Sequence, residues 1–182
     1  MMGNDEKRAL TQSELVDAVN SLKAATTINE LLLRASESLG VIYSVYIHFP
    51  AIGAVDFNNT GVFHHYKVPD EIVNFYNSTA KSHGDPVCIA AFAKGSPFWL
   101  SDSFSEPYII KLGYEKVIQR ALELLKDGLC CPLFGPDGRK GYSFISFDRD
   151  KDEFDPIMQL QIQAITQIMH IQYCLLLKGL QK

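Results

Sequence analysis

Two pairs of short, mostly apolar segments that are typical of strands constrain the fold of this chain most strongly. The first pair is 41–49 with 61–66, and the second is 129–134 with 141–147. A polar turn around Asn58-Asn59 separates the first pair and Gly135-Pro-Asp-Gly138 separates the second, and both are typical of β-hairpins. Hairpin connections pair their strands antiparallel, so the sequence predicts a mainly antiparallel sheet.

Helical patterns flank and separate these strands. Thr11 and Glu14 have the spacing of a capping box, and Asp85-Pro86 has the residue types preferred at an N-cap and at the first helical position. Apolar residues then recur as they do on one face of a helix. The patterns predict helices that begin at Thr11 and Thr27 and helices over 69–84, 85–95, 106–127 and 156–177.

A further short strand at 97–100 brings the predicted sheet to five strands, with helices before, between and after them. This order predicts the α/β (α+β) class, as an α/β/α sandwich with a central, mainly antiparallel five-stranded sheet. The length of 182 residues suits one sizeable core. We expect a flexible polar arm at 1–10 and a single domain over 11–182.

The charge balance narrows the class of partner. With 17 basic and 21 acidic side chains the net charge is −4, and Lys and Arg form no cluster, so the chain alone is a poor nucleic-acid binder. No apolar run reaches the roughly 18 residues of a membrane span, and the N-terminus lacks the apolar stretch of a secretory signal. We therefore expect a cytoplasmic protein without membrane contact.

The four cysteines, at 88, 130, 131 and 174, indicate no metal or redox site. No C-x-x-C pair occurs, so the usual spacing of zinc sites and of thioredoxin-like motifs is missing. Strand alternation points the adjacent Cys130 and Cys131 to opposite faces of the sheet. We expect all four to be reduced thiols in the core.

The other polar residues form no catalytic set. His64 and His65 are neighbours on a predicted strand, so they face opposite ways and cannot share one ion; a site joining one of them to Cys88 stays an alternative. The glycine-containing segment 135–141 lacks the G-K-[ST] ending of a phosphate loop. Because no nucleophile, base and orienting group occur together, the sequence predicts no enzyme, no cofactor and no metal.

Four motifs follow one another through the middle of the chain. They are Val68-Pro-Asp-Glu-Ile-Val-Asn-Phe-Tyr76, Asp85-Pro-Val87, Pro97-Phe-Trp-Leu-Ser-Asp102 and Gly128-Leu-Cys-Cys-Pro-Leu-Phe-Gly-Pro-Asp-Gly-Arg-Lys-Gly141. Their order and spacing resemble the autoinducer-binding domain of LuxR-type quorum-sensing regulators, over roughly residues 61–148. The resemblance implies a domain that binds an N-acyl homoserine lactone, or a related small apolar signal, inside the fold.

Two retained positions carry the most direct implications of this resemblance. In the family the residue at Asp85 accepts a hydrogen bond from the ligand amide, and Tyr76 closes the first motif as it does in the family. Each also has a purely structural explanation, because Asp85 suffices as a helix N-cap and Tyr76 suits the apolar face of a helix. Both explanations stay open at this point.

Three positions depart from the family pattern. Val68 and Ile72 stand where the family has a Tyr and a Trp that donate to ligand carbonyls, and Leu100 replaces a further Trp, with Trp99 one position earlier. We expect all four to line the pocket, although Trp99 also suits a core position. Val and Ile side chains donate nothing, and an unpaired buried carbonyl costs about 1–3 kcal/mol. The candidate substitute donors are Tyr46, Tyr66, Ser146 and water.

The resemblance also implies partners. Regulators of this type carry a helix-turn-helix domain after a linker, and Lys182 lies near where that linker should begin. We expect an excised sensor domain whose DNA contact lies elsewhere; the alternative is a natural form that lacks the DNA-binding domain. We expect a homodimer, or a heterodimer, formed through the final helix over 156–179. The alternative is a ligand-independent interaction module, in which side chains fill the cavity and the final helix mediates dimerisation.

Overall fold

The computed structural model describes residues 9–49, 61–83 and 85–180 and contains one five-stranded sheet. The strands are β1 Tyr43–Phe49, β2 Val62–Tyr66, β3 Phe98–Trp99, β4 Gly128–Phe134 and β5 Lys140–Ser146. Their order is β2-β1-β5-β4-β3 and every neighbouring pair is antiparallel. The predicted antiparallel five-stranded sheet is therefore confirmed, while the turn expected at Asn58-Asn59 lies outside the described residues.

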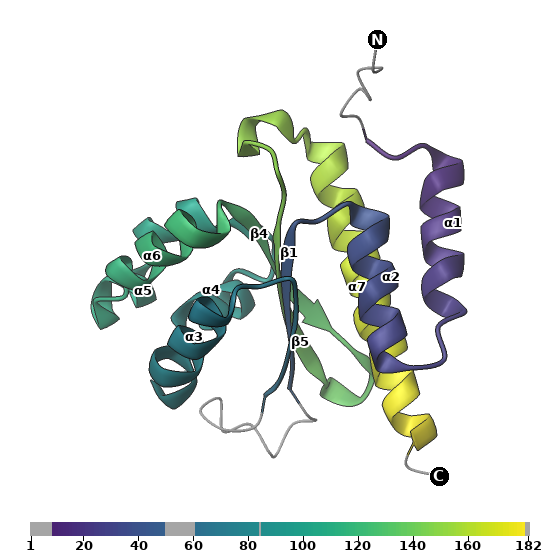
Figure 1. Cartoon of the computed structure of the whole chain (residues 1–182), viewed down its shortest axis with the longest axis horizontal. Coiled ribbons are helices and arrows are strands. Elements are labelled where there is room, and N and C mark those ends of the chain that lie inside the picture. Colours follow the sequence, from purple (N-terminus) through teal and green to yellow (C-terminus); the bar gives the residue numbers. More distant parts are fainter. Residues whose placement is uncertain (1–8, 50–60, 84, 181–182) are drawn as a thin grey trace.

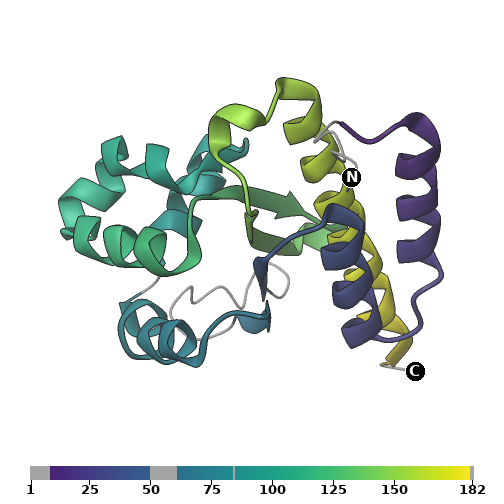
Figure 2. The same ribbon diagram turned by 45° about the horizontal axis from the view of Figure 1, so that its top comes forward.

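Helices cover both faces of this sheet. They are α1 Gln12–Lys23, α2 Ile28–Leu39, α3 Asp70–His83, α4 Pro86–Lys94, α5 Pro107–Leu112, α6 Glu115–Leu125 and α7 Pro156–Leu180. Figures 1 and 2 show α1, α2 and α7 on one side, here called the α7 face, and α3 to α6 on the other, here called the α3–α6 face. The α/β/α sandwich is confirmed.

The predicted capping residues set several helix ends. Thr11 and Glu14 form a complete capping box at α1, and Thr27 accepts a hydrogen bond from the Glu30 amide at α2. Asp85 caps α4 with Pro86 in the first turn. These local signals therefore place the start of α4, and with it the Asp85 side chain.

The helix expected over 106–127 is instead two helices. Gly113 adopts a left-handed backbone conformation with φ +63°, and its amide donates to the carbonyls of Ile109 and Ile110, which ends α5. Tyr114 then precedes α6. The expected strand at 97–100 is also shorter, because a 3₁₀ turn begins at Leu100.

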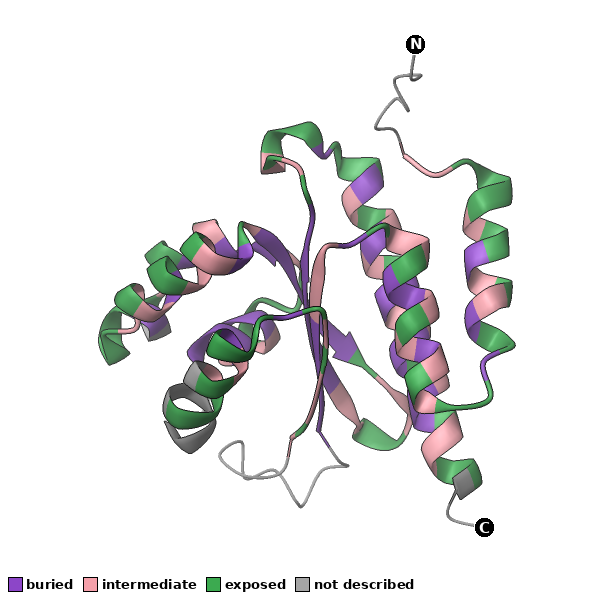
Figure 3. Ribbon diagram, in the orientation of Figure 1, coloured by how far each residue is buried: buried purple, intermediate pink, exposed green. Residues whose placement is uncertain are grey.

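Alternation along the central strands divides the buried residues into two cores. Val45 and Ile47 of β1 belong to the α3–α6 face, whereas Tyr46 belongs to the α7 face. Cys130 and Cys131 likewise lie in opposite cores, as predicted, and Figure 3 shows burial concentrated on the sheet and on the inward sides of the helices. Among the described residues no helix is both long and apolar enough to span a membrane.

Candidate functional site

A cavity of about 100 Å³ lies between the sheet and α3 to α6. Aliphatic and aromatic side chains make up most of its wall, and four polar side chains enter it, from Tyr76, Asp85, Tyr114 and Tyr142. A mostly apolar cavity with a few convergent polar groups is the usual form of a site for a small organic molecule.

Asp85 is the charged group in this cavity, which we call the Asp85 cavity. Its Oδ1 accepts hydrogen bonds from the amides of Val87, at 2.9 Å, and Cys88, at 3.4 Å. The Tyr76 hydroxyl donates to the same carboxylate. Burial raises the pKa of Asp85, and these three hydrogen bonds oppose that rise. A carboxylate has about four acceptor positions, so capacity remains for a ligand donor.

Tyr114 contributes the other distinctive polar group. Its buried hydroxyl has no hydrogen-bond partner among the described residues. Burial and the negative charge of Asp85 raise the pKa of Tyr114, so the hydroxyl stays protonated and able to donate. By contrast, the Tyr142 hydroxyl is paired with Cys130 Sγ at 3.3 Å. The cavity thus holds an acceptor and an unused donor.

Five of the residues predicted to contact a ligand belong to this face. Ile72, Tyr76, Asp85 and Leu100 line the cavity itself. Val68 is buried in the same core without lining the cavity. Residues from three of the four sequence motifs therefore lie on one face of the sheet.

The structure places the other four predicted residues differently. Trp99 packs against Phe154 on the α7 face, with ring centroids 5.1 Å apart. Ser146 donates its hydroxyl to the Leu125 carbonyl. The remaining two residues, Tyr46 and Tyr66, line a second cavity on the α7 face. None of the four lines the Asp85 cavity.

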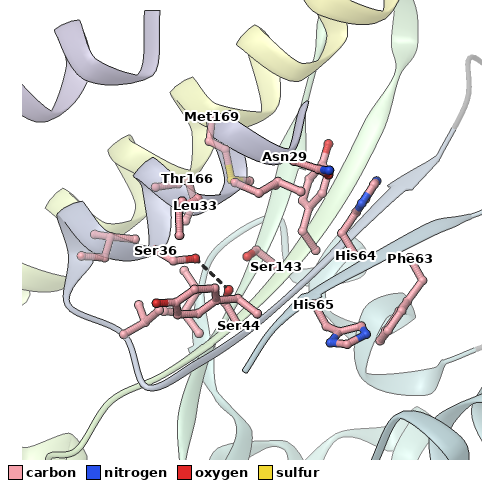
Figure 4. Close-up of a pocket in the computed structure, with 17 residues that line it drawn as sticks. Asn29, Leu33, Ser36, Ser44, Phe63, His64, His65, Ser143, Thr166 and Met169 are labelled. Atoms are coloured by element: carbon pink, nitrogen blue, oxygen red, sulfur yellow. Dashed lines mark hydrogen bonds between the residues drawn. The ribbon is translucent and has the colours of Figure 1, made fainter. Parts of the chain in front are cut away.

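This second cavity, shown in Figure 4, is larger, at about 380 Å³, and lies among α2, α7, β1 and β2. The Ser36 and Ser44 hydroxyls bond to each other at 3.1 Å, and Ser143 donates to the Val45 carbonyl. Thr166 donates to carbonyls of its own helix. Because its buried polar side chains are already paired, this cavity is the weaker candidate despite its size.

Sequence reasoning missed Tyr114. It was assigned to the interior of a helix over 106–127, where nothing distinguished it from other amphipathic positions. The signal that could have found it is Gly113, since a glycine inside a helical pattern can mark a helix end. Tyr114 then becomes a residue between two helices, free to turn toward the sheet.

The sequence profile of the family described as autoinducer binding domain matches residues 24–173. No curated protein matches the chain. Among solved structures, 47 chains match.

Three of these structures, of two proteins, match with TM-scores of 0.67 or 0.68. The N-acylhomoserine lactone dependent LuxR family transcriptional factor CepR2 from Burkholderia cenocepacia matches with a TM-score of 0.68 and 17% identity, over 91% of this chain and 95% of CepR2. Escherichia coli SdiA matches with a TM-score of 0.67 and 18% identity, over 93% of this chain and 68% of SdiA. SdiA in complex with octanoyl-rac-glycerol matches with a TM-score of 0.67 and 19% identity, over 96% and 70% of the two chains. At these identities the likeness shows a shared fold.

Proposed function

We propose that this chain, which belongs to the family of autoinducer-binding domains of LuxR-type regulators, senses a small acylated signal in the Asp85 cavity. The family is a signal-binding regulator domain and not an enzyme family. The observation that carries the proposal is the Tyr114 hydroxyl, which has no hydrogen-bond partner within residues 9–49, 61–83 and 85–180 and shares an apolar cavity with the Asp85 carboxylate. An acceptor and a donor at one cavity suit an amide, which offers an N–H and a carbonyl.

Tyr114 supplies what the aliphatic residues Val68 and Ile72 cannot. In the family pattern a Tyr and a Trp at those positions donate to ligand carbonyls, and here neither side chain has a donor. We assign the acyl carbonyl to the Tyr114 hydroxyl and the amide N–H to Asp85. A hydrogen bond to a charged group is worth about 1.5–3 kcal/mol, so Asp85 is the main orienting contact.

The ligand class follows from these two groups. An N-acyl homoserine lactone carries the required amide, and an acylglycerol carries hydroxyls that could donate to Asp85. SdiA has been solved with octanoyl-rac-glycerol, so a related fold accepts the second class. The cavity volume of about 100 Å³ is below the roughly 300 Å³ typical of ligand sites, so lining side chains must move apart to admit an acyl chain.

We also propose that two copies associate through α7. Large apolar side chains at Ile157, Leu160, Ile171 and Leu175 are between 40% and 64% exposed. Together with the exposed Ala164 they recur at helical spacing, which places them along one side of α7. We expect a dimer that Leu160→Glu disrupts and Gln159→Glu does not, as measured by sedimentation equilibrium. DNA contact would belong to a domain outside this chain.

Thermal unfolding against a panel of ligands tests the sensing proposal. The panel contains N-acyl homoserine lactones of increasing chain length and octanoylglycerol. A ligand that binds only the folded state at a hundredfold excess over Kd stabilises it by about 2.7 kcal/mol, so at least one compound should raise the unfolding midpoint by several degrees. No rise with any member of the panel would contradict the proposal.

The second candidate function is a ligand-independent dimerisation module, favoured by the exposed apolar residues of α7 and by the small size of the Asp85 cavity. Solvent extraction of the purified protein followed by mass spectrometry separates the two. A stoichiometric small molecule supports sensing. A folded dimer that contains no small molecule and does not respond to the panel supports the module.

A further inference from the structure

A cluster of three metal-ligating side chains lies buried between β1 and α7, on the face opposite to the Asp85 cavity. His170 and Cys174 are one helical turn apart on α7, and His48 comes from β1. Their possible ligand atoms all lie within 4.8 Å of one another. His48 is 3% exposed, and His170 and Cys174 are fully buried.

One atom of this cluster has no structural explanation. The buried Nδ1 of His48 has no hydrogen-bond partner among the described residues. Buried polar atoms are nearly always paired, so an exception of this kind calls for a partner that the described part of the chain does not provide. Burial lowers the pKa of both His48 and His170 to about 4, so both rings are neutral at pH 7 and can offer a lone pair.

The surrounding backbone is adapted to the position of His170. Gly141 is the cross-strand neighbour of His48, and a Cβ there would lie 2.6 Å from His170 Nδ1. A Cβ at Gly135 would lie 2.8 Å from His170 Nε2. Side chains at either glycine would therefore displace the imidazole, and their absence lets it sit against the sheet beside His48.

We propose that His48, His170 and Cys174 bind a thiophilic d¹⁰ metal ion, Zn²⁺ or Cu⁺. Imidazole and thiolate are the ligands that such ions prefer. Ligand atoms around a tetrahedral zinc ion are about 3.3–3.7 Å apart, so small side-chain rotations would close the site. Three protein ligands leave a further coordination position for water or another small ligand.

A hydrogen bond already orients one of the proposed ligands. His170 Nε2 lies 3.9 Å from Cys174 Sγ, and its other ring nitrogen, Nδ1, lies 2.7 Å from the Tyr46 hydroxyl. Histidines that bind metals commonly donate their second ring N–H to such a partner, which fixes the tautomer and the ring orientation. Binding at His170 Nε2 requires the tautomer in which Nδ1–H donates to the Tyr46 hydroxyl. The His170 ring also hydrogen-bonds to the Arg139 backbone, and an ion at Nε2 would replace any such bond that this nitrogen makes.

Charge around the cluster bears on which ion is held more tightly. Coordination replaces the thiol proton of Cys174 by the metal and releases that proton to solvent. Burial raises the pKa of the Cys174 thiol, and the positive charges of Arg139 and Lys178 oppose that rise while Asp137 adds to it. Cu⁺ with one thiolate is neutral, whereas Zn²⁺ leaves one positive charge near Arg139, whose guanidinium donates to the Cys174 carbonyl at 3.3 Å. We therefore expect tighter binding of Cu⁺.

Metal titration of the full chain tests the proposal. After treatment with a chelator, Co²⁺ is added as a spectroscopic substitute for Zn²⁺ and the thiolate-to-cobalt absorption is followed; Cu⁺ is measured by competition with a coloured cuprous chelator. We expect one ion per chain. Cys174→Ala should weaken binding at least about 100-fold, and Tyr46→Phe about tenfold, since outer-shell partners are worth about 10- to 100-fold.

Cys131→Ala is the matched control, because Cys131 is also fully buried and lies in the core of the same face. It should bind as the wild type does. Circular dichroism establishes whether each variant is folded. If Cys174→Ala does not fold, His48→Gln is used in its place. Failure of the folded wild type to bind either ion would overturn the proposal. Wild-type affinity in Cys174→Ala, or in His48→Gln where it is used instead, would also overturn it. A loss of affinity in Cys131→Ala as large as that in Cys174→Ala would do the same.

Discussion

The two faces of the sheet each hold one buried polar atom without a partner among the described residues, Tyr114 Oη on the α3–α6 face and His48 Nδ1 on the α7 face. Their neighbours differ. Tyr114 borders an apolar cavity that also contains a carboxylate, whereas His48 faces an imidazole and a thiol. The first environment suits an organic ligand with an amide, and the second suits a metal ion. The chemistry of the neighbouring groups, more than cavity volume, distinguishes the two.

The largest expected change in the free energy of unfolding comes from a packing residue of the α7 face. Tyr173 is almost completely buried, and its ring lies 5.0 Å from that of Tyr46 and 4.9 Å from that of His48. Tyr173→Ala should lower the free energy of unfolding by about 3–5 kcal/mol, as for other large aromatic truncations. Denaturant unfolding measures it. A loss below about 1 kcal/mol would contradict tight packing around Tyr173 on this face.

A smaller loss is expected from one hydroxyl on the same face. Tyr46→Phe removes the partner of His170 Nδ1, which is fully buried and would be left unpaired. The free energy of unfolding should fall by about 1–3 kcal/mol. Chemical denaturation of chelator-treated protein checks this value, and a variant as stable as wild type would mean that the hydrogen bond contributes nothing net.

The matched change on the other face should behave differently. Tyr114→Phe removes a hydroxyl that has no partner among the described residues, so the free energy of unfolding should stay within about 0.5 kcal/mol of wild type or rise. Affinity for the acylated ligand should fall by about 1 kcal/mol, or roughly fivefold. Unfolding and ligand titration are both needed. A clear loss of stability without a loss of affinity would assign Tyr114 to the core.

The smallest effect concerns pH. Burial raises the pKa of Asp85 above its ordinary value of 3.8, so the folded chain holds this proton more tightly than the unfolded chain. Its contribution to stability is therefore greatest below that value and declines as pH rises through the folded-state pKa. Asp85→Asn preserves the N-cap and cannot ionise. We expect it to be at least as stable as wild type at pH 7, with the difference shrinking toward pH 3.5. A wild type more stable than Asp85→Asn at pH 7 would contradict this sign.

Short sequence motifs correctly predicted the helix starts and the turn that depend on interactions between neighbouring residues. Capping at Thr11, the Asp85-Pro86 helix start and the 135–138 turn depend on residues within a few positions of one another. The position of Asp85 in the cavity follows directly from the start of α4. Motif order added Ile72 and Tyr76, because both lie on α3, the helix before α4.

The face on which a strand residue lies could not be predicted. Both faces of the sheet are covered by helices, so both are apolar, and alternation separates Phe98 from Trp99 without indicating which of them borders the cavity. The pattern therefore predicts Trp99 and Tyr46 at the ligand site, whereas both lie on the α7 face and the Asp85 cavity lies on the opposite face of the sheet. His48 and His170 are far apart in the sequence, so no spacing rule could have joined them.

Calorimetric titration of the lactone that stabilises the protein most gives the most direct test of the Asp85 cavity as the signal site. Calorimetry is preferable to intrinsic fluorescence because Trp99, the only tryptophan, lies on the α7 face. Asp17→Asn is the control, because Asp17 is exposed on α1 and its replacement removes the same negative charge as Asp85→Asn does. We predict that Asp85→Asn weakens binding at least about tenfold, since charge-assisted hydrogen bonds are roughly twice as strong as neutral ones, and that Asp17→Asn binds as wild type. Equal affinities in all three proteins would contradict the assignment.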